Sequence, residues 1–201
     1  LSKRFKRALM RSVARLTYEQ VQTAQDGTPD EQTQPLMDTV IKPLYGAFEI
    51  LERAREARGA LELDLPERRV ILDEDGHMVG IEPRQRLDSH KLIEEFMVLA
   101  NVAAAEYLEE KKRPCMYRVH DEPSMSKVEA LSEVLDSVHI SFDKGQTLTP
   151  ARFNAILARA KDTPHQQMIN DVVLRSQAQA LYQPDNLGHF GLALRRYCHF
   201  T

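Results

Sequence analysis

The chain has 201 residues, of which 42% are hydrophobic and 28% are charged, and its formal net charge is −3 at pH 7. This composition is typical of a folded globular chain, and no apolar run approaches the roughly 18 residues that a membrane-spanning helix needs. The balance of charge is not the strongly basic one of many nucleic-acid-binding proteins. The length predicts one domain or at most two, and no apolar signal segment follows the basic start, so the cytoplasm is the expected location.

The N-terminal region combines a basic run with a helix-start signal. Thr17 and Gln20 form a possible capping box around Tyr18, which predicts a short helix that ends before the next Gly-Thr-Pro sequence. Helical periodicity returns from about Leu36 and stops at Gly59. The preceding basic run is interpreted as a solvated face, with a strip that faces phosphates as the alternative. Its residues are Lys3, Arg4, Lys6, Arg7, Arg11 and Arg15.

A change of period follows the second helical segment. Three leucines at positions 61, 63 and 65 alternate with acidic residues, and Val70 to Leu72 has the composition of a strand. Asp73 to Gly76 forms a tight-turn sequence before a second apolar run from Met78 to Ile81. The pattern predicts a small antiparallel β-meander over about residues 61–82.

The remaining segments are mostly helical. The longest predicted helix covers about residues 88–111, where apolar residues recur at helical spacing. Residues 116–119 are short and strand-like. Further helices are predicted over 124–138, 150–160 and 164–182, the last two with proline at the first helical position. The fold class is therefore α+β, predominantly α-helical, with one small β insertion.

A metal-dependent active site is not evident from the residues alone. Hydrolysis of phosphodiesters by metal ions needs several carboxylates that converge on one or two cations. Asp73, Glu74 and Asp75 form a run of acidic residues of the kind found in metal sites. Exposed acids are common at hairpin turns, however, so the turn interpretation is preferred. Glu94 and Glu95 are adjacent and point to different faces of a helix, so they are not a paired acid and base.

Histidine and cysteine residues also lack a recognised ligand spacing. His120 with Asp121 and Glu122 is one conceivable metal site, and His189 with His199 is another, yet neither has a third ligand at a known spacing. We favour hydrogen-bonded structural roles for these histidines. The two cysteines, at positions 115 and 198, are interpreted as reduced packing residues. No serine elbow, phosphate-binding loop or dinucleotide fingerprint is present.

Several ordered motifs resemble one enzyme family. The C-terminal segment 187–201 resembles the GHFGLAL…Y…HFT sequence of the catalytic RNB domain of the ribonuclease R and ribonuclease II family. Residues 14–21 are similar to its ARLTY motif, and residues 55–61 to its AREERG segment. Further matches are residues 90–97 with 100–101 (HKLIEE-M-LAN), 117–121 (R-H-D), and 174–176 with 179–180. Six ordered motifs at family-like spacing cover nearly the whole chain.

The resemblance implies a processive 3′-to-5′ exoribonuclease that hydrolyses single-stranded RNA to nucleoside 5′-monophosphates. The family binds Mg²⁺ through aspartates upstream of the ARLTY motif, and its catalytic arginine lies in a Ser-Pro-Ile-Arg-Arg segment that would follow Thr201. We therefore expect residues 1–201 to be the central to C-terminal part of one RNB domain, truncated at both ends. This chain would then hold no catalytic or metal-binding residue and would be inactive alone. Neither DNA nor a membrane is an expected partner.

Three residues carry RNA contacts if the resemblance is transferred position by position. Tyr18 stands where the family places a tyrosine near the ribose of the 3′-terminal nucleotides. Glu94 stands where a glutamate accepts a hydrogen bond from a 2′-hydroxyl, which DNA lacks. Leu63 replaces a phenylalanine that stacks on the last bases in many relatives, so stacking there is expected to be weaker. The alternative is a non-catalytic RNA-binding or helix-packing module, in which Tyr18 packs on a helix and Glu94 is a solvated acid.

Overall fold

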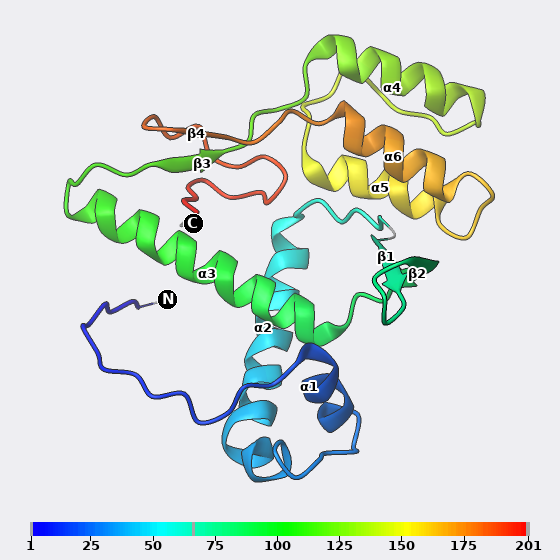
Figure 1. Cartoon of the computed structure of the whole chain (residues 1–201). Coiled ribbons are helices and arrows are strands. Elements are labelled where there is room, and N and C mark those ends of the chain that lie inside the picture. Colours follow the sequence, from blue (N-terminus) through cyan, green and yellow to red (C-terminus); the bar gives the residue numbers. More distant parts are fainter. Residues whose placement is uncertain (1, 66, 200–201) are drawn as a thin grey trace. The chain divides into compact units, whose positions relative to one another are not determined.

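The computed structural model describes residues 2–65 and 67–199 (Figure 1). Its backbone contacts group the chain into two compact units. Unit 1 comprises Leu1–Ala54 and Arg86–Ala103, and unit 2 comprises Arg55–Gln85 and Ala104–Thr201. The chain passes between the units three times, within α2 (Lys42–Arg58), between residues 85 and 86, and within α3 (Asp88–Glu110), so each of these two helices contributes residues to both units. No helix in the described ranges combines the length and the apolar character needed to cross a bilayer.

Unit 1 is built from helices. It contains α1 (Tyr18–Gln25), a 3₁₀ turn (Gln34–Leu36), a π-helical turn (Met37–Ile41), most of α2 (Lys42–Arg58) and the first part of α3 (Asp88–Glu110). The capping box that opens α1 is confirmed: Gln20 N–H donates to Thr17 Oγ1 over 3.2 Å, and Thr17 N–H donates to Gln20 Oε1 over 2.9 Å. Ala24, Ile41, Tyr45, Phe48 and Leu92 form its buried core. Residues 2–17 form no helix or strand.

Unit 2 has its largest core among three helices. These are α4 (Met125–Ser137), α5 (Pro150–Ala160) and α6 (Gln166–Ser176), which Figure 1 shows next to one another. Leu131, Phe153, Ile169 and Val173 are almost completely buried between them. Helices are therefore present in all three predicted places, with α5 at the expected boundaries, whereas α6 begins at Gln166 and not at Pro164, and ends at Ser176 and not at Tyr182.

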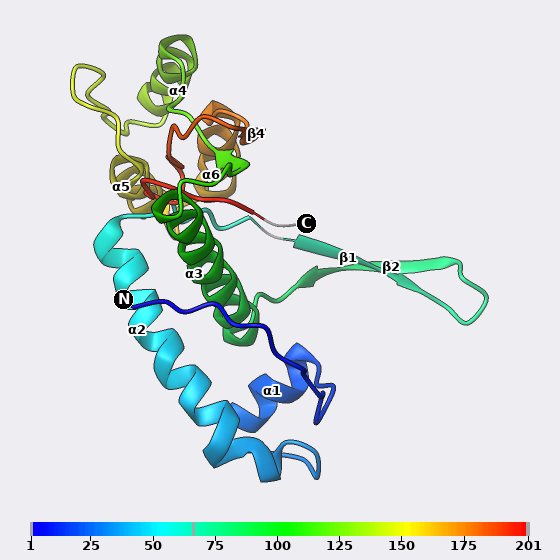
Figure 2. The same cartoon turned by 90° about the vertical axis from the view of Figure 1, so that its left-hand side faces the viewer.

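The β structure differs in detail from the expected meander. Strands β1 (Glu67–Leu72) and β2 (Met78–Arg84) form an antiparallel hairpin with a bulge next to Leu72, drawn as a long ribbon in Figure 2. Residues 61–65 form no strand. The N–H groups of Glu62 and Asp64 donate to the side chains of Asn154 and Asn170, each over 2.9 Å, so two of the donors that a third strand would use are satisfied by helices α5 and α6.

A second two-stranded sheet follows where one long helix was predicted. Helix α6 ends at Ser176, and the buried Gln177 side chain donates to Val173 O over 3.1 Å at the end of that helix. Strand β4 (Leu181–Gln183) then pairs antiparallel with β3 (Tyr117–Val119), which lies at the strand-like segment expected from the sequence. Helical periodicity does not reveal this pairing, because its two strands are about sixty residues apart in the chain.

Candidate nucleic-acid interface

Tyr18 is held at the start of α1 by contacts with the start of α3. It is the first residue of α1, and its carbonyl oxygen accepts a hydrogen bond from Ser89 Oγ over 2.9 Å. Ser89 N–H donates to Gln22 Oε1 over 3.1 Å, which ties the two helix starts together a second time. The Tyr18 side chain remains 40% exposed. The backbone of Tyr18 is therefore fixed, while its ring is available to solvent.

The Tyr18 ring stacks on His90. The ring centroids are 4.2 Å apart and the ring planes are inclined by 20°. His90 Nδ1 accepts a hydrogen bond from Leu87 N–H over 3.3 Å, so the proton of the neutral imidazole lies on Nε2. His90 Nε2 is buried and has no hydrogen-bond partner among the described residues. This stack was not foreseen, although His90 belongs to the HKLIEE match and precedes Glu94 by four positions.

Glu94 lies on α3 one turn after His90. Residues four apart share one face of a helix, so the two side chains are neighbours on the surface of α3. The Glu94 carboxylate forms an ion pair with Arg86, and its side chain is 37% exposed. The adjacent Glu95 is only 5% exposed, which confirms that the two glutamates face different sides. Tyr18 and Glu94 therefore belong to one arrangement, linked through His90.

An apolar pocket lies next to Tyr18 in unit 1. Its volume is about 150 Å³, and its lining includes Tyr18, Tyr45 and Leu92. Tyr45 and Ser89 at its wall already have hydrogen-bond partners, since Tyr45 Oη donates to Gln22 Oε1 over 3.3 Å and Ser89 bonds to Tyr18 O and Gln22 Oε1. The pocket therefore offers a surface for packing rather than a set of free polar groups.

Leu63, the third predicted contact residue, belongs to unit 2. It is partly buried and packs against the core of helices α4, α5 and α6. This packing accounts for an apolar residue at position 63 without RNA. The structure therefore groups Tyr18 with Glu94 in unit 1 and places Leu63 in unit 2.

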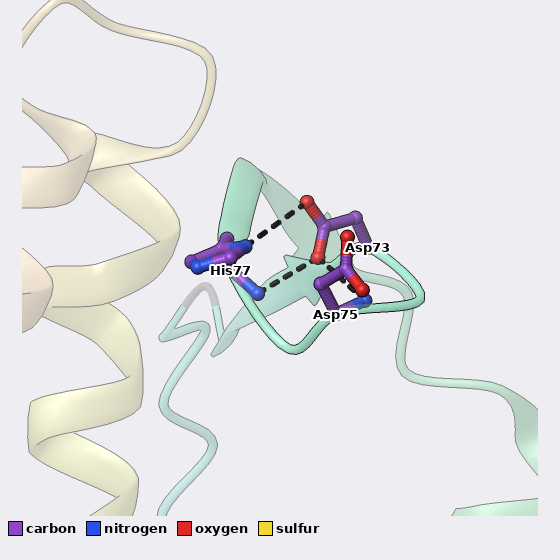
Figure 3. A group of neighbouring side chains, drawn as sticks. All are labelled: Asp73, Asp75 and His77. Carbon is purple, nitrogen blue, oxygen red and sulfur yellow. Dashed lines mark hydrogen bonds and ion pairs between the residues drawn. The ribbon is translucent and has the colours of Figure 1, made fainter.

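One cluster in the described ranges has the side chains to hold a metal ion. Asp73, Asp75 and His77 offer ligand atoms within 4.8 Å of one another at the tip of the β1–β2 hairpin (Figure 3). Asp73 Oδ1 accepts hydrogen bonds from the N–H groups of Asp75 and His77, over 3.0 and 2.8 Å. All three residues are exposed. The arrangement is that of an aspartate that stabilises a turn, as expected.

His120 and His189 form a buried structural pair in unit 2. His120 Nδ1 accepts from Gly191 N–H over 2.8 Å, and Nε2 therefore donates to Ala178 O over 2.9 Å. His189 Nδ1 accepts from Leu192 N–H over 3.2 Å. Burial lowers the pKa of His120 and lowers that of His189 to about 4, where the neighbouring His120 contributes further. Both rings are neutral parts of the fold, as the sequence indicated.

The other residues of the C-terminal motifs are also engaged in packing. Arg118 stacks over the Tyr182 ring at 4.5 Å, and Arg196 pairs with Glu109 over 2.6 Å. Burial raises the pKa of Cys115 and raises that of Cys198 to about 11, so both thiols stay protonated, as packing residues do. Phe200 and Thr201, which complete the HFT match, lie outside the described residues.

Comparison with known proteins decides the family. The sequence pattern of the RNB domain matches residues 1–201. This chain belongs to the RNB domain family. Over 200 residues, 98% of the chain, it is 38% identical to ribonuclease R of Escherichia coli. The chain spans about 24% of the length of that relative.

Solved structures share the fold of this RNB domain. A Mycoplasma genitalium RNase R, solved in complex with ribose-methylated single-stranded RNA, matches 92% of the chain with a TM-score of 0.83 and 26% identity, and the match covers 29% of that protein. Yeast Ssd1, a pseudonuclease, matches 92% of the chain with a TM-score of 0.62 and 19% identity, and this likeness concerns the fold alone. The expected family and the α+β fold class are thus confirmed.

Proposed function

We propose that the protein containing this RNB domain is a processive 3′-to-5′ exoribonuclease that hydrolyses single-stranded RNA to nucleoside 5′-monophosphates. The observation that supports it most is the grouping of Tyr18, His90 and Glu94 in a chain 38% identical to ribonuclease R. An exposed tyrosine ring, stacked on a histidine that lies one helical turn before a carboxylate on α3, is suited to a sugar with a free hydroxyl. The site of action is the cytoplasm, and neither DNA nor a membrane is a partner.

Glu94 is the group that distinguishes RNA from DNA in this proposal. An ionised carboxylate accepts hydrogen bonds only, so it recognises the 2′-hydroxyl of a ribose and finds no donor at the 2′ position of a deoxyribose. The ion pair with Arg86 orients the Glu94 carboxylate. Tyr18 packs against the same ribose, and Leu63 supplies apolar contact without the stacking of an aromatic ring.

The described residues do not fit the Mg²⁺ site that the family implies. Their one candidate cluster is the exposed hairpin tip, where Asp73 Oδ1 already accepts two backbone hydrogen bonds. We propose, as the family resemblance implies, that the ligands of Mg²⁺ lie in parts of the protein outside this chain. The role of the chain is to bind and orient the RNA 3′ end, and the chain alone is inactive.

The test uses the intact protein that contains this chain. Wild-type protein should shorten a 5′-labelled single-stranded RNA progressively from its 3′ end and release nucleoside 5′-monophosphates, identified by chromatography. An oligonucleotide of the same sequence with deoxyribose throughout is the matched control and should persist. Endonucleolytic fragments, or binding of RNA without hydrolysis, would refute the exonuclease proposal, and the second result would favour the non-catalytic module.

A further inference from the structure

We infer that His90 is a positioning residue for RNA: it holds the Tyr18 ring in the plane in which that ring meets the 3′-terminal ribose. The inference rests on the proposed function and adds a residue to its RNA site. His90 acts through Tyr18 and takes no part in the chemistry. Its contribution is to the choice between ribose and deoxyribose at the 3′ end.

The first argument is that different residues hold the backbone and the ring of Tyr18: Ser89 bonds to the backbone, and His90 stacks on the ring. Ser89 Oγ donates to the Tyr18 carbonyl and thereby fixes the start of α1. That bond leaves the side-chain torsions of Tyr18 free. The ring is 40% exposed, and its stacking partner is the His90 ring, at 4.2 Å and 20°. A ring already held in its binding orientation loses less side-chain entropy when a ligand binds.

The second argument is that His90 is itself held by the backbone of α3. Leu87 is the residue before α3, and His90 is the third residue of that helix. His90 Nδ1 accepts from Leu87 N–H over 3.3 Å, which is the bond that a glutamate or glutamine makes in a capping box. The orientation of the imidazole is therefore set by the helix start, and the orientation of Tyr18 is set in turn by the imidazole.

The third argument comes from the other ring nitrogen. With Nδ1 as acceptor, Nε2 carries the proton, and this donor is buried without a partner among residues 2–65 and 67–199. A buried donor without a partner destabilises a fold. A phenylalanine would stack on Tyr18 without that cost, so stacking alone does not account for a histidine. Only histidine supplies both a flat ring and an acceptor at the δ position.

The geometry also links His90 to Glu94. The two residues are four positions apart on α3, so the support for the ring and the proposed acceptor of the 2′-hydroxyl lie one turn apart on a rigid helix. Groups carried by one helix keep their spacing better than groups on separate loops. A shift of the Tyr18 ring would therefore move a bound ribose relative to Glu94, which stays in place.

Two substitutions separate the two properties of His90. His90→Asn keeps an acceptor near the δ position for Leu87 N–H and removes the stacked ring. His90→Phe keeps the ring and removes the acceptor. His139→Asn is the matched control, because His139 is an exposed residue with φ of 60° in unit 2, a conformation that asparagine tolerates.

The measurement is made on the intact protein with two RNA substrates. One substrate is all-ribose, and the other has 2′-deoxyribose in its last two nucleotides. The readout is the kcat/KM for the all-ribose substrate divided by the kcat/KM for the deoxyribose-ended substrate. Partial unfolding lowers both values equally and leaves this ratio unchanged. We expect His90→Asn to lower the ratio by roughly two- to tenfold, the size of an aromatic pair interaction, and His139→Asn to stay within about twofold of wild type. His90→Phe should show a smaller loss than His90→Asn, because it keeps the stacked ring and loses the hydrogen bond that fixes the orientation of that ring.

Combination with Tyr18→Leu tests whether His90 acts through Tyr18. The double variant Tyr18→Leu, His90→Asn should show no further loss beyond Tyr18→Leu alone, because the supported ring is already absent. Additive losses would overturn the inference, and so would an unchanged ratio in His90→Asn. Wild-type protein without exonuclease activity would refute the proposed function itself, whereas an active wild type with an insensitive His90→Asn refutes the role of His90 alone.

Discussion

Two histidine sites in this chain both contact other rings and differ in their hydrogen bonding. In unit 2, His120 is 8% exposed, and both of its ring nitrogens bond to backbone groups far away in sequence. In unit 1, His90 bonds through one nitrogen only and stacks on an exposed tyrosine. A fully satisfied, buried histidine stabilises the fold. A histidine that leaves a donor unpaired and supports an exposed ring is better explained by a ligand.

The largest expected effect is on stability at the buried site. His120→Ala leaves the Gly191 N–H and the Ala178 carbonyl without their partners and creates a cavity under Phe190. We expect the free energy of unfolding to fall by about 2–4 kcal/mol. Urea denaturation followed by circular dichroism measures this change. His90→Asn should cost less than half as much, and equal losses at both sites would remove the distinction between them.

The next effect is a loss of stability at acid pH. The folded state lowers the pKa of His189 to about 4 from an ordinary value near 6.5, so the folded state binds fewer protons than the unfolded state between these values. Stability is therefore complete above about pH 6.5 and falls as the pH drops toward 4, by on the order of 2 kcal/mol.

The loss of stability at acid pH depends on the groups around His189 as well as on His189 itself. His120, whose pKa is also lowered, and Arg118 are the charged or titratable groups that act on His189. Melting temperatures between pH 4 and pH 8 check the slope for wild type and for His189→Gln, which should show a shallower decline below pH 6.5. The same slope in both proteins would show that His189 is not responsible.

A smaller effect is expected at the exposed site, and on specificity rather than stability. Glu94→Ala removes the proposed acceptor of the 2′-hydroxyl hydrogen bond and leaves Arg86 exposed to solvent. Discrimination between RNA and DNA substrates in the intact protein should fall by roughly tenfold, which corresponds to about 1.4 kcal/mol. The melting temperature should change little. Unchanged discrimination would contradict the role assigned to Glu94.

The smallest effect is expected at the tip of the β1–β2 hairpin, where Asp73, Asp75 and His77 lie close together. Asp73→Asn keeps the Oδ1 acceptor for the N–H groups of Asp75 and His77 and removes the charge. If the cluster is a turn and not a metal site, stability should change by less than about 0.5 kcal/mol. The Mg²⁺ concentration for half-maximal activity of the intact protein should stay the same. A shift in that concentration would mean that the tip binds the ion.

Local signals account for the parts of the fold that were predicted correctly. The Thr17 and Gln20 capping box, the proline that opens α5, and the Asp73 turn each depend on neighbours within a few residues. Such contacts are readable from the sequence because both partners lie in one short window. The exposed face of Glu94 and the buried face of Glu95 follow from helical periodicity in the same way.

Contacts between distant segments account for what the sequence did not reveal. Residues 61–65 alternate like a strand, but the side chains of Asn154 and Asn170 take the place of a strand partner. The predicted helix to Tyr182 ends at Ser176 because Leu181–Gln183 pairs with Tyr117–Val119. In each case the competing partner lies far away in the chain.

The sequence by itself determined the family and the helical character, and it identified Tyr18, Leu63 and Glu94 as candidate RNA contacts. It could do so because motifs, caps and periodicity are local properties of a chain. Only the tertiary structure decided that Tyr18 on α1 stacks on His90 of α3, and that Leu63 packs in a core. The physical reason is that stacking and burial depend on which helices meet. Tyr18 and His90 are brought together by the packing of α1 on α3, across about seventy residues of chain.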